Sequence, residues 1–297
     1  NPPSTNTVFP SLRAMPCPSW SIDSIVSVNK SGMENFKMGV ASYRKLAWRE
    51  RSVILWGNGH LKSAAMPLIL AIESSSHVGA IALVRVGDAS GASYGEVVRN
   101  EIKLSGWTLP AVQRVLAEAK IRNEEIDAVA FGAGPGSFSG VRTACATAQA
   151  LAYAWRKPLI SVDSLEALAE ASQLPRVSIV IDARMQEVYS ASFVRDDSAA
   201  LRRLSKTTVI TRTSIRVQDG CVALGSGAYL LPQLEGNAVA SPEQTAFAEA
   251  NWALGVARVA ARRLALGHVT PATSAEPFYV RNNVAQTEAE RAAVATR

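Results

Sequence analysis

The stretch Ile126-Asp-Ala-Val-Ala-Phe-Gly-Ala-Gly-Pro-Gly-Ser-Phe-Ser-Gly-Val-Arg-Thr143 decides the fold of this chain. Its first part, Ile126 to Phe131, is an apolar run broken only by one aspartate, and it predicts a short buried strand. Four glycines follow within nine residues, and glycine permits positive φ angles and the close approach of a backbone or a ligand. Gly140 to Arg156 predicts a helix with a thin polar stripe, covered by its own sheet on one side and by a partner on the other. Ser137 or Ser139 is expected to cap this helix.

The glycine loop has two interpretations. As a phosphate cradle, it would place backbone N–H groups and a helix dipole where an anion binds. The pattern Gly134-x-Gly136-x-x-Ser139, followed by a strand Leu159 to Val162 that ends in Asp163, imitates a dinucleotide fingerprint. However, its third glycine is a serine, and no Gly-Lys-Ser/Thr follows. The spacing therefore favours the second interpretation, a structural turn that allows tight strand-to-helix packing.

Composition limits the classes of protein to which the chain can belong. Its 297 residues suffice for one large or two modest domains, and 48% apolar with 19% charged residues is typical of a globular protein. The net charge of +6 comes mainly from residues 1–65, whose balance is +5, against +1 for residues 66–297. The body therefore offers no broad phosphate-binding field. No apolar run approaches the roughly 18 residues of a membrane span, and we expect a cytoplasmic protein.

The three cysteines are scattered and contain no Cys-x-x-Cys pair, so they predict neither a disulfide framework nor a zinc site. Cys145 lies in the helix after the glycine loop and is expected to be a small buried residue.

Residues 1–65 differ from the rest of the chain. They show no sustained hydrophobic period, and three acidic residues count against a transit peptide. We expect them to be an extension outside the fold, poorly ordered or not native, and the folded body to begin at Met66.

From Met66 onward the pattern predicts regular elements. The expected strands are Leu68 to Ile72, Val78 to Val86 and Glu96 to Lys103, and the expected helices are Trp107 to Lys120 and Ser164 to Ala171. Later elements are a strand Val222 to Gly225 and a long helix Thr245 to Leu266.

The opening pattern recurs in the second half of the chain. Val177 to Ile181 is an apolar strand, Asp182 follows it, and Glu187 to Val194 returns as a strand. Glu73 and Asp182 hold the same place, each an acid at the turn of a hairpin. We interpret this as an internal duplication with halves 66–175 and 176–297, and the alternative is two buried hairpins that are alike by chance.

Duplicated hairpins with an acid at the first turn resemble the actin-like ATPase superfamily, an α/β fold of the ribonuclease H-like type. Within it, five motifs resemble the TsaB (YeaZ) family of bacterial tRNA threonylcarbamoyladenosine biosynthesis proteins. They are Ile69-Leu-Ala-Ile-Glu-Ser-Ser, Gly134-Pro-Gly-Ser-Phe-Ser-Gly-Val-Arg142, Pro158-Leu-Ile-Ser-Val-Asp-Ser-Leu-Glu-Ala-Leu168, Ile181-Asp-Ala-Arg-Met-Gln-Glu-Val-Tyr189 and Pro277-Phe-Tyr-Val-Arg281. They run in family order from Met66 to about Glu290, and Ser139 stands where the family has threonine.

The resemblance implies a non-catalytic subunit with no metal. The catalytic sister, TsaD, holds its metal through Asn-His-Met-Glu-Gly-His, where this chain has Asp163-Ser-Leu-Glu-Ala-Leu168. Ser164 and Leu168 cannot replace two imidazole ligands. The implied role is a scaffold or activating subunit that forms a heterodimer with TsaD, is joined by the ATPase TsaE, and contacts tRNA through the complex. ATP and threonylcarbamoyl-adenylate would be used by the complex, with no cofactor on this chain alone.

The partner surface is expected on the helices Trp107 to Lys120 and Gly140 to Arg156. Its predicted residues share spacings of three and four, which place them on one stripe of each helix. They are Val112, Val115, Leu116, Gly140, Thr143, Ala144, Thr147, Ala148 and Leu151. The same helices would serve a third possibility, a self-sufficient homodimer.

The alternative function is a nucleotide-dependent small-molecule kinase or a dinucleotide enzyme that uses the loop from Gly134 to Gly140. Its nucleotide would be held by Glu73, Ser74, Gly134, Gly136 and Ser137. Glu73 and Asp182 could orient magnesium-bound water, as acids at these turns do in the superfamily's ATPases. The competing interpretation is that each acid caps its own hairpin through backbone N–H groups.

Overall fold

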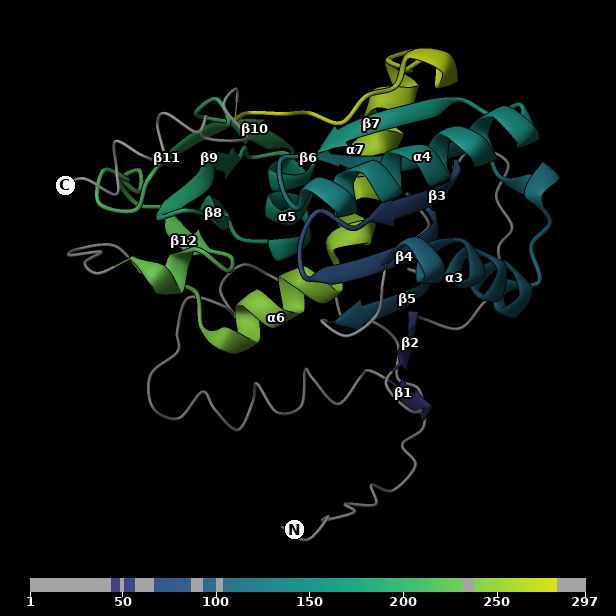
Figure 1. Cartoon of the computed structure of the whole chain (residues 1–297), viewed down its shortest axis with the longest axis horizontal. Helices are drawn as coiled ribbons and strands as arrows, with labels where there is room; N and C mark the ends of the chain where they lie inside the picture. Colours follow the sequence, from purple (N-terminus) through teal and green to yellow (C-terminus); the bar gives the residue numbers. More distant parts are fainter. Residues whose placement is uncertain are drawn as a thin grey trace, which may run out of the picture.

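The computed structural model describes residues 67–86, 93–99, 104–231 and 238–281, together with the backbone of 44–48 and 51–56. Two β-sheets and the helices packed on them make up this part of the chain (Figure 1).

The first sheet has seven strands in the order β1-β2-β5-β4-β3-β6-β7. Their bounds are β1 Arg44–Trp48, β2 Arg51–Trp56, β3 Leu68–Glu73, β4 Val78–Arg85, β5 Ser93–Arg99, β6 Ala128–Gly134 and β7 Leu159–Asp163. The first five strands pair antiparallel, whereas β3, β6 and β7 run parallel. The backbone of β1 and β2 thus continues the sheet beyond β5. The remainder of residues 1–65 lies outside the described residues, so their role as a separate extension stays a prediction.

The second sheet has the order β10-β9-β8-β12, with β11 also paired to β9. Its strands are β8 Arg176–Arg184, β9 Glu187–Arg195, β10 Leu201–Arg203, β11 Thr208–Thr211 and β12 Val222–Leu224. The hairpin β8–β9 has a parallel neighbour, β12, beside its first strand, just as the hairpin β3–β4 has β6. Each half therefore repeats one topology, which confirms the predicted duplication.

Helices cover both faces of the first sheet. They are α3 Leu104–Ala119, α4 Phe138–Trp155, α5 Ser164–Ser172, α6 Pro242–Ala250 and α7 Trp252–Ala265, with short 3-10 turns η1 Asn123–Glu125, η2 Ala228–Leu230 and η3 Ala272–Ser274. Side chains alternate along β3 because successive residues of a strand point to opposite faces. Leu68, Leu70 and Ile72 pack towards α3 and α4. Ile69 and Ala71 pack towards α5 and α7.

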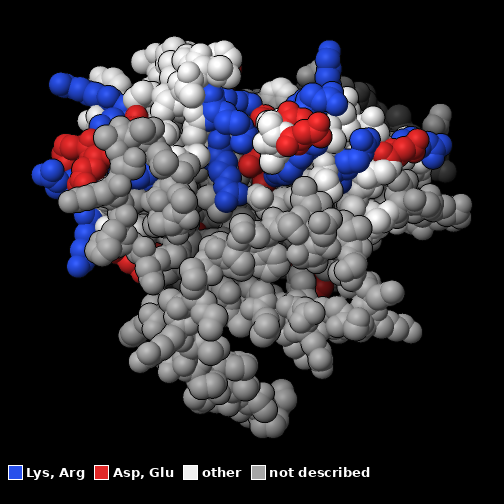
Figure 2. Space-filling model, turned by 180° about the vertical axis from the view of Figure 1, so that it is seen from behind, with Lys and Arg blue, Asp and Glu red and all other residues white. Residues whose placement is uncertain are grey.

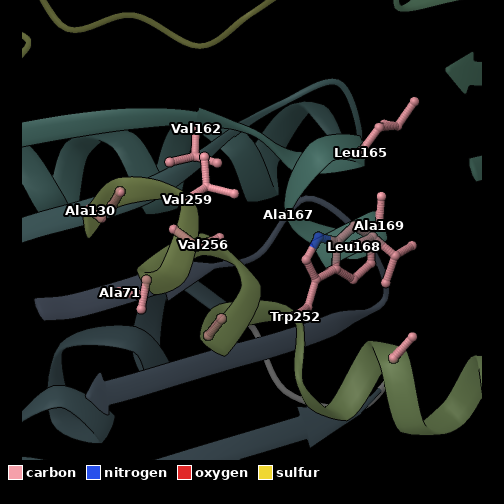
Figure 3. Packing of buried hydrophobic residues seen from close by; sticks show 14 of the residues in the cluster. Ala71, Ala130, Val162, Leu165, Ala167, Leu168, Ala169, Trp252, Val256 and Val259 are labelled. Atoms are coloured by element: carbon pink, nitrogen blue, oxygen red, sulfur yellow. The ribbon is translucent and has the colours of Figure 1, made fainter. Parts of the chain in front are cut away.

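The largest core lies between the two sheets, where α7 packs on α5 (Figure 3). Small residues of the first sheet, Ala71 and Ala130, leave room for Val256 and Val259 of α7. Trp252 is fully buried at the start of α7, and its indole N–H donates to the Ser164 carbonyl at 2.7 Å. This bond ties the C-terminal helix to the first turn of α5.

Several sequence-based expectations need correction. The long helix Thr245 to Leu266 is two helices, because Asn251 leaves the helical conformation (φ −98°, ψ 8°) and its side-chain amide donates to the Phe247 carbonyl at 2.8 Å. The strand expected at Glu96 to Lys103 begins earlier, at Ser93, and residues 100–103 lie outside the described residues. The short strands β10 and β11 were not predicted.

The cap of α4 also differs from the expectation. Ser137 is the N-cap residue, but its side chain makes no capping bond and lies 3.5 Å from the Ser139 hydroxyl.

Cys145 is buried, as predicted. Among the helices of the described ranges, none is long and apolar enough to cross a membrane.

Two helical glycines provide a matched test of this packing. A Cβ atom at Gly255 would lie 2.0 Å from the Ala167 carbonyl oxygen, whereas nothing lies within 4 Å of a Cβ atom at Gly106 in α3. Gly255→Ala should lower the free energy of unfolding by about 1–3 kcal/mol, since backbone must move apart. Gly106→Ala should raise it by up to ~1 kcal/mol through helix propensity. Urea denaturation of both variants measures this, and equal effects of the two would contradict the assigned α5–α7 contact.

Candidate functional site

The candidate site lies where β3 ends against the glycine loop. Glu73, the last residue of β3, is fully buried. One carboxyl oxygen accepts the backbone N–H of Ser75 at 2.6 Å, and the other accepts the hydroxyl of Ser164 at 2.9 Å. The Ser164 hydroxyl in turn accepts the N–H of Gly134 at 3.1 Å. The acid therefore joins the first hairpin, the glycine loop and the start of α5.

The loop glycines make room for this turn. A Cβ atom at Gly132 would lie 1.8 Å from a carboxyl oxygen of Glu73. Cβ atoms at Gly136 and Gly140 would lie 2.0 Å and 1.8 Å from the carbonyl oxygens of Ser75 and Ser74.

Hydrogen bonds close the same contact. The Ser137 N–H donates to the Ser75 carbonyl at 2.6 Å, and the Ser74 hydroxyl donates to the Gly140 carbonyl at 2.7 Å. Atoms of the chain itself thus occupy the space beside the loop, which is the arrangement that the structural-turn interpretation expects.

The environment of Glu73 disfavours a charged carboxylate. Burial raises the pKa of this carboxyl above its ordinary value of 4.5, and the hydrogen bonds from Ser75 and Ser164 offset only part of that effect. No described Lys, Arg or His forms an ion pair with it. The raised pKa works against a role as a magnesium ligand, which must be ionised.

Asp182, the corresponding acid of the second half, has a different environment. It is partly exposed and pairs with the guanidinium of Arg212 at 3.0 Å, and it accepts the N–H of Arg184 at 2.9 Å. The backbone bonds at Glu73 and Asp182 match the interpretation that each acid caps its own hairpin. The turn after Asp182 holds three consecutive residues in the left-handed region, at φ 62°, 52° and 59°.

A second glycine turn repeats the arrangement of the first half. Gly225 and Gly227 follow β12, and their Cβ atoms would lie 2.5 Å from the Val180 carbonyl oxygen and 3.0 Å from the Asp182 nitrogen. The Asp182 N–H donates to the hydroxyl of Ser226 at 3.2 Å. Sequence reasoning missed this turn, although Gly225-Ser-Gly227 directly after a predicted strand was the available signal.

The positions that correspond to the metal ligands of the catalytic sister are filled by other contacts. Ser164 is committed to Glu73 and Gly134, and Leu168 is fully buried in the core between the sheets. In the part of the chain that the structure describes, no three His, Cys, Asp or Glu side chains gather in a way that could hold a metal ion.

Comparison with known proteins finds relatives of one family. The family model described as "TsaD: tRNA N6-adenosine threonylcarbamoyltransferase" matches residues 102–216. The tRNA threonylcarbamoyladenosine biosynthesis protein TsaB of Escherichia coli is 31% identical over 228 residues, which cover 73% of this chain and 96% of that protein. The chain belongs to the TsaB family. The Haemophilus influenzae TsaB is 36% identical over 43% of this chain and 54% of its own length.

Solved structures support the same assignment. YeaZ from Pseudomonas aeruginosa matches with a TM-score of 0.61 and 28% identity, over 72% of this chain and 100% of that one. Together with the two duplicated sheets, this likeness identifies the actin-like, ribonuclease H-like α/β fold that the motifs predicted.

The predicted partner stripe divides into two groups in this TsaB-family fold. The buried group packs beneath the helices against the first sheet and comprises Val112, Val115, Gly140, Ala144, Ala148 and Leu151. Leu116, Thr143 and Thr147 are half-buried and reach the surface. The small-residue spacing therefore marks the inner face of α4. The expectation that the buried group contacts a partner directly is corrected, because these residues pack on the chain's own sheet. For the other three residues it stays a prediction.

The C-terminal segment crosses from one half to the other over the glycine loop. The Phe278 N–H donates to the Ala133 carbonyl at 2.6 Å, and the Gln149 amide donates to the carbonyls of Ala272 and Ala275. Farther on, Arg281 donates to the Ala183 carbonyl at 3.0 Å and bonds to Glu187. The family motif Pro277 to Arg281 thus holds the second hairpin beside the first half, along the irregular segment drawn in yellow in Figure 1.

Titration of Glu73 provides a test of this site. The native state binds the Glu73 proton more tightly than the unfolded chain does, so the free energy of unfolding should fall as the pH rises from 4.5 towards the raised pKa. Glu73→Gln reproduces the neutral form and should lack that contribution. The free energy of unfolding of the wild type minus that of the variant, measured by urea denaturation, should decrease with pH. The decrease should be about 1.4 kcal/mol for each unit by which the pKa is raised.

The control for this test is Glu243→Gln. A hydrogen bond from the Ser241 side chain lowers the pKa of exposed Glu243. The free energy of unfolding of the wild type minus that of Glu243→Gln should therefore rise slightly with pH. A Glu73 difference that is flat or rising would show that the buried carboxyl is ionised.

Proposed function

We propose that this chain is a non-catalytic subunit in tRNA threonylcarbamoyladenosine biosynthesis, which holds a TsaD partner in its active form. Its partners would be TsaD, in a heterodimer, and the ATPase TsaE, with tRNA bound by the assembled complex. The complex would transfer a threonylcarbamoyl group from its adenylate to the adenosine beside the anticodon of tRNAs that read codons beginning with A. ATP would serve the complex, and this chain would carry no cofactor of its own in the cytoplasm.

The observation that carries the proposal is the filled junction between the first hairpin and the glycine loop. The carbonyl groups of Ser74 and Ser75 occupy the positions beside Gly140 and Gly136 where a phosphate would approach the loop. Glu73 is buried with no ion pair to a described Lys, Arg or His, and Asp182 is paired with Arg212. These contacts support a structural use of the residues that a kinase or dinucleotide enzyme would need for its ligand.

The outer surface of α3 and α4 supports the proposed partner contact. Leu109 and Tyr153 are 46% and 74% exposed on these two helices, and Thr143 and Thr147 are half-buried on α4. Large exposed apolar side chains beside small residues suit a facing pair of helices, because small residues allow close approach.

A charge placed on this surface distinguishes a partner face from ordinary surface. Thr147→Arg should weaken TsaD binding by at least about 2 kcal/mol, because the guanidinium is driven into a desolvated interface. Its melting temperature should stay near that of the wild type, since Thr147 reaches the surface. The readout is the dissociation constant for TsaD from the same source, by titration calorimetry.

Thr213→Arg is the matched control, because Thr213 is exposed on the second half, away from both helices. If both variants bind TsaD as the wild type does, the face is wrongly assigned. If the wild type does not bind TsaD and instead binds ATP, ADP or NAD stoichiometrically at micromolar concentration, the scaffold proposal fails in favour of the enzyme.

A further inference from the structure

An arginine and two aromatic rings form an exposed cluster at the start of α4. Arg142 is the fifth residue of this helix, and its guanidinium carbon stands 3.8 Å from the centre of the Phe138 ring. Its Nε donates to the hydroxyl of Tyr279 at 2.8 Å, and the Tyr279 ring centre is 5.9 Å away. Residues 137 positions apart in the sequence thus hold one guanidinium in place.

The cluster leaves its binding groups open. Within the described ranges, no carboxylate pairs with Arg142, and its two terminal amino groups make no hydrogen bond. Phe138 and Tyr279 are 51% and 45% exposed, with ring centres 6.2 Å apart. The neighbouring Arg281, by contrast, is bonded to Glu187. A guanidinium held in place, with no carboxylate partner among the described residues and two half-exposed rings beside it, has the groups to bind an anion attached to a flat group.

We infer that Phe138, Arg142 and Tyr279 bind a single-stranded segment of RNA, with Arg142 on a phosphate and the rings against an unpaired base. Aromatic rings and guanidinium planes are the groups on which proteins stack unpaired RNA bases. The positive end of the α4 dipole adds to the attraction for phosphate. This inference rests on the proposed function, whose substrate adenosine lies in the unpaired anticodon loop.

Charge distribution favours such a local contact over a broad electrostatic one. Residues 66–297 carry a net charge of only +1, and the described part of the face in Figure 2 shows basic and acidic groups side by side. A duplex recognised through its phosphates alone would need a larger basic surface. A stacked base with one phosphate needs only the three residues of the cluster.

The test compares the affinity of the TsaD complex for two RNAs. One is an anticodon stem–loop from a tRNA that reads codons beginning with A, and the other is a fully paired duplex of the same length. Arg142→Ala should weaken stem–loop binding about tenfold, and the slope of log affinity against log salt should fall by about 0.7, as for one lost phosphate contact. Duplex binding should change less than twofold.

Two conservative variants separate charge from stacking. Arg142→Lys keeps the charge and should keep the salt slope while still weakening stem–loop binding several-fold. Tyr279→Phe keeps the ring but removes the hydroxyl that holds Nε, and should give a smaller loss. Arg216→Ala removes an exposed arginine of the second half and should change stem–loop affinity less than twofold.

Three outcomes would overturn the inference. Arg142→Ala and Arg216→Ala could weaken binding equally, the wild-type complex could prefer the duplex, or Arg142→Ala could weaken TsaD binding while the assembled complex keeps its stem–loop affinity. The last result would identify a protein contact. If the wild type does not bind TsaD at all, the proposed function fails. The same RNA comparison on the chain alone then shows whether the cluster binds RNA.

Discussion

The close contact between the first hairpin turn and the glycine loop is the constraint on which the rest of the structure depends. Side chains are excluded at Gly132, Gly136 and Gly140 because carboxyl and carbonyl oxygens lie where their Cβ atoms would be. Helix α4 starts at this loop, and α5 starts at Ser164, which bonds to Glu73 and Gly134. Since α4 and α5 cover opposite faces of the first sheet, one junction fixes the origin of both helical layers.

Duplication supplied two such junctions, and their acids now have different chemistry. Glu73 is enclosed and hydrogen-bonded to neutral donors, so burial keeps its pKa high. Asp182 is partly exposed, pairs with the guanidinium of Arg212, and accepts the N–H of Arg184 in the turn that it caps. An actin-like catalyst needs both carboxylates ionised and open to a shared metal-bound water. In this chain each acid accepts the backbone N–H two residues further on and so stabilises its own turn.

The sequence predicted the strands and helices whose apolar residues recur regularly because they pack in or on a sheet. It also predicted both acid-tipped hairpins. It did not predict β10 and β11, because Leu201-Arg-Arg203 and Thr208-Val-Ile-Thr211 are short and polar and become strands only by pairing with β9. The break at Asn251 was missed for a similar reason. No proline or glycine marks it, and the buried Asn251 ends α6 while Trp252 begins α7 with its indole bonded to Ser164.

Predictions for the site were limited by the ambiguity of small residues. Glycine admits a phosphate or a backbone equally well, so the loop pattern alone could not distinguish a cradle from a turn. Likewise, the stripe containing Ala144 and Ala148 was predicted to face a partner, whereas it packs on the chain's own sheet, because small residues at this spacing suit either contact. The cluster of Arg142 and Tyr279 had no local signal, because its members lie 137 residues apart in the sequence.

The fixed position of α4 would favour binding at its outer surface, where both contacts are proposed. The junction holds its N-terminus, the first sheet holds its inner stripe, and the C-terminal segment holds Gln149 through two carbonyls. A surface fixed on three sides loses little conformational freedom when a partner or an RNA segment binds, and binding then retains more of the contact energy. The buried junction would thus support both proposed contacts without touching a ligand, since it fixes the helix that carries them.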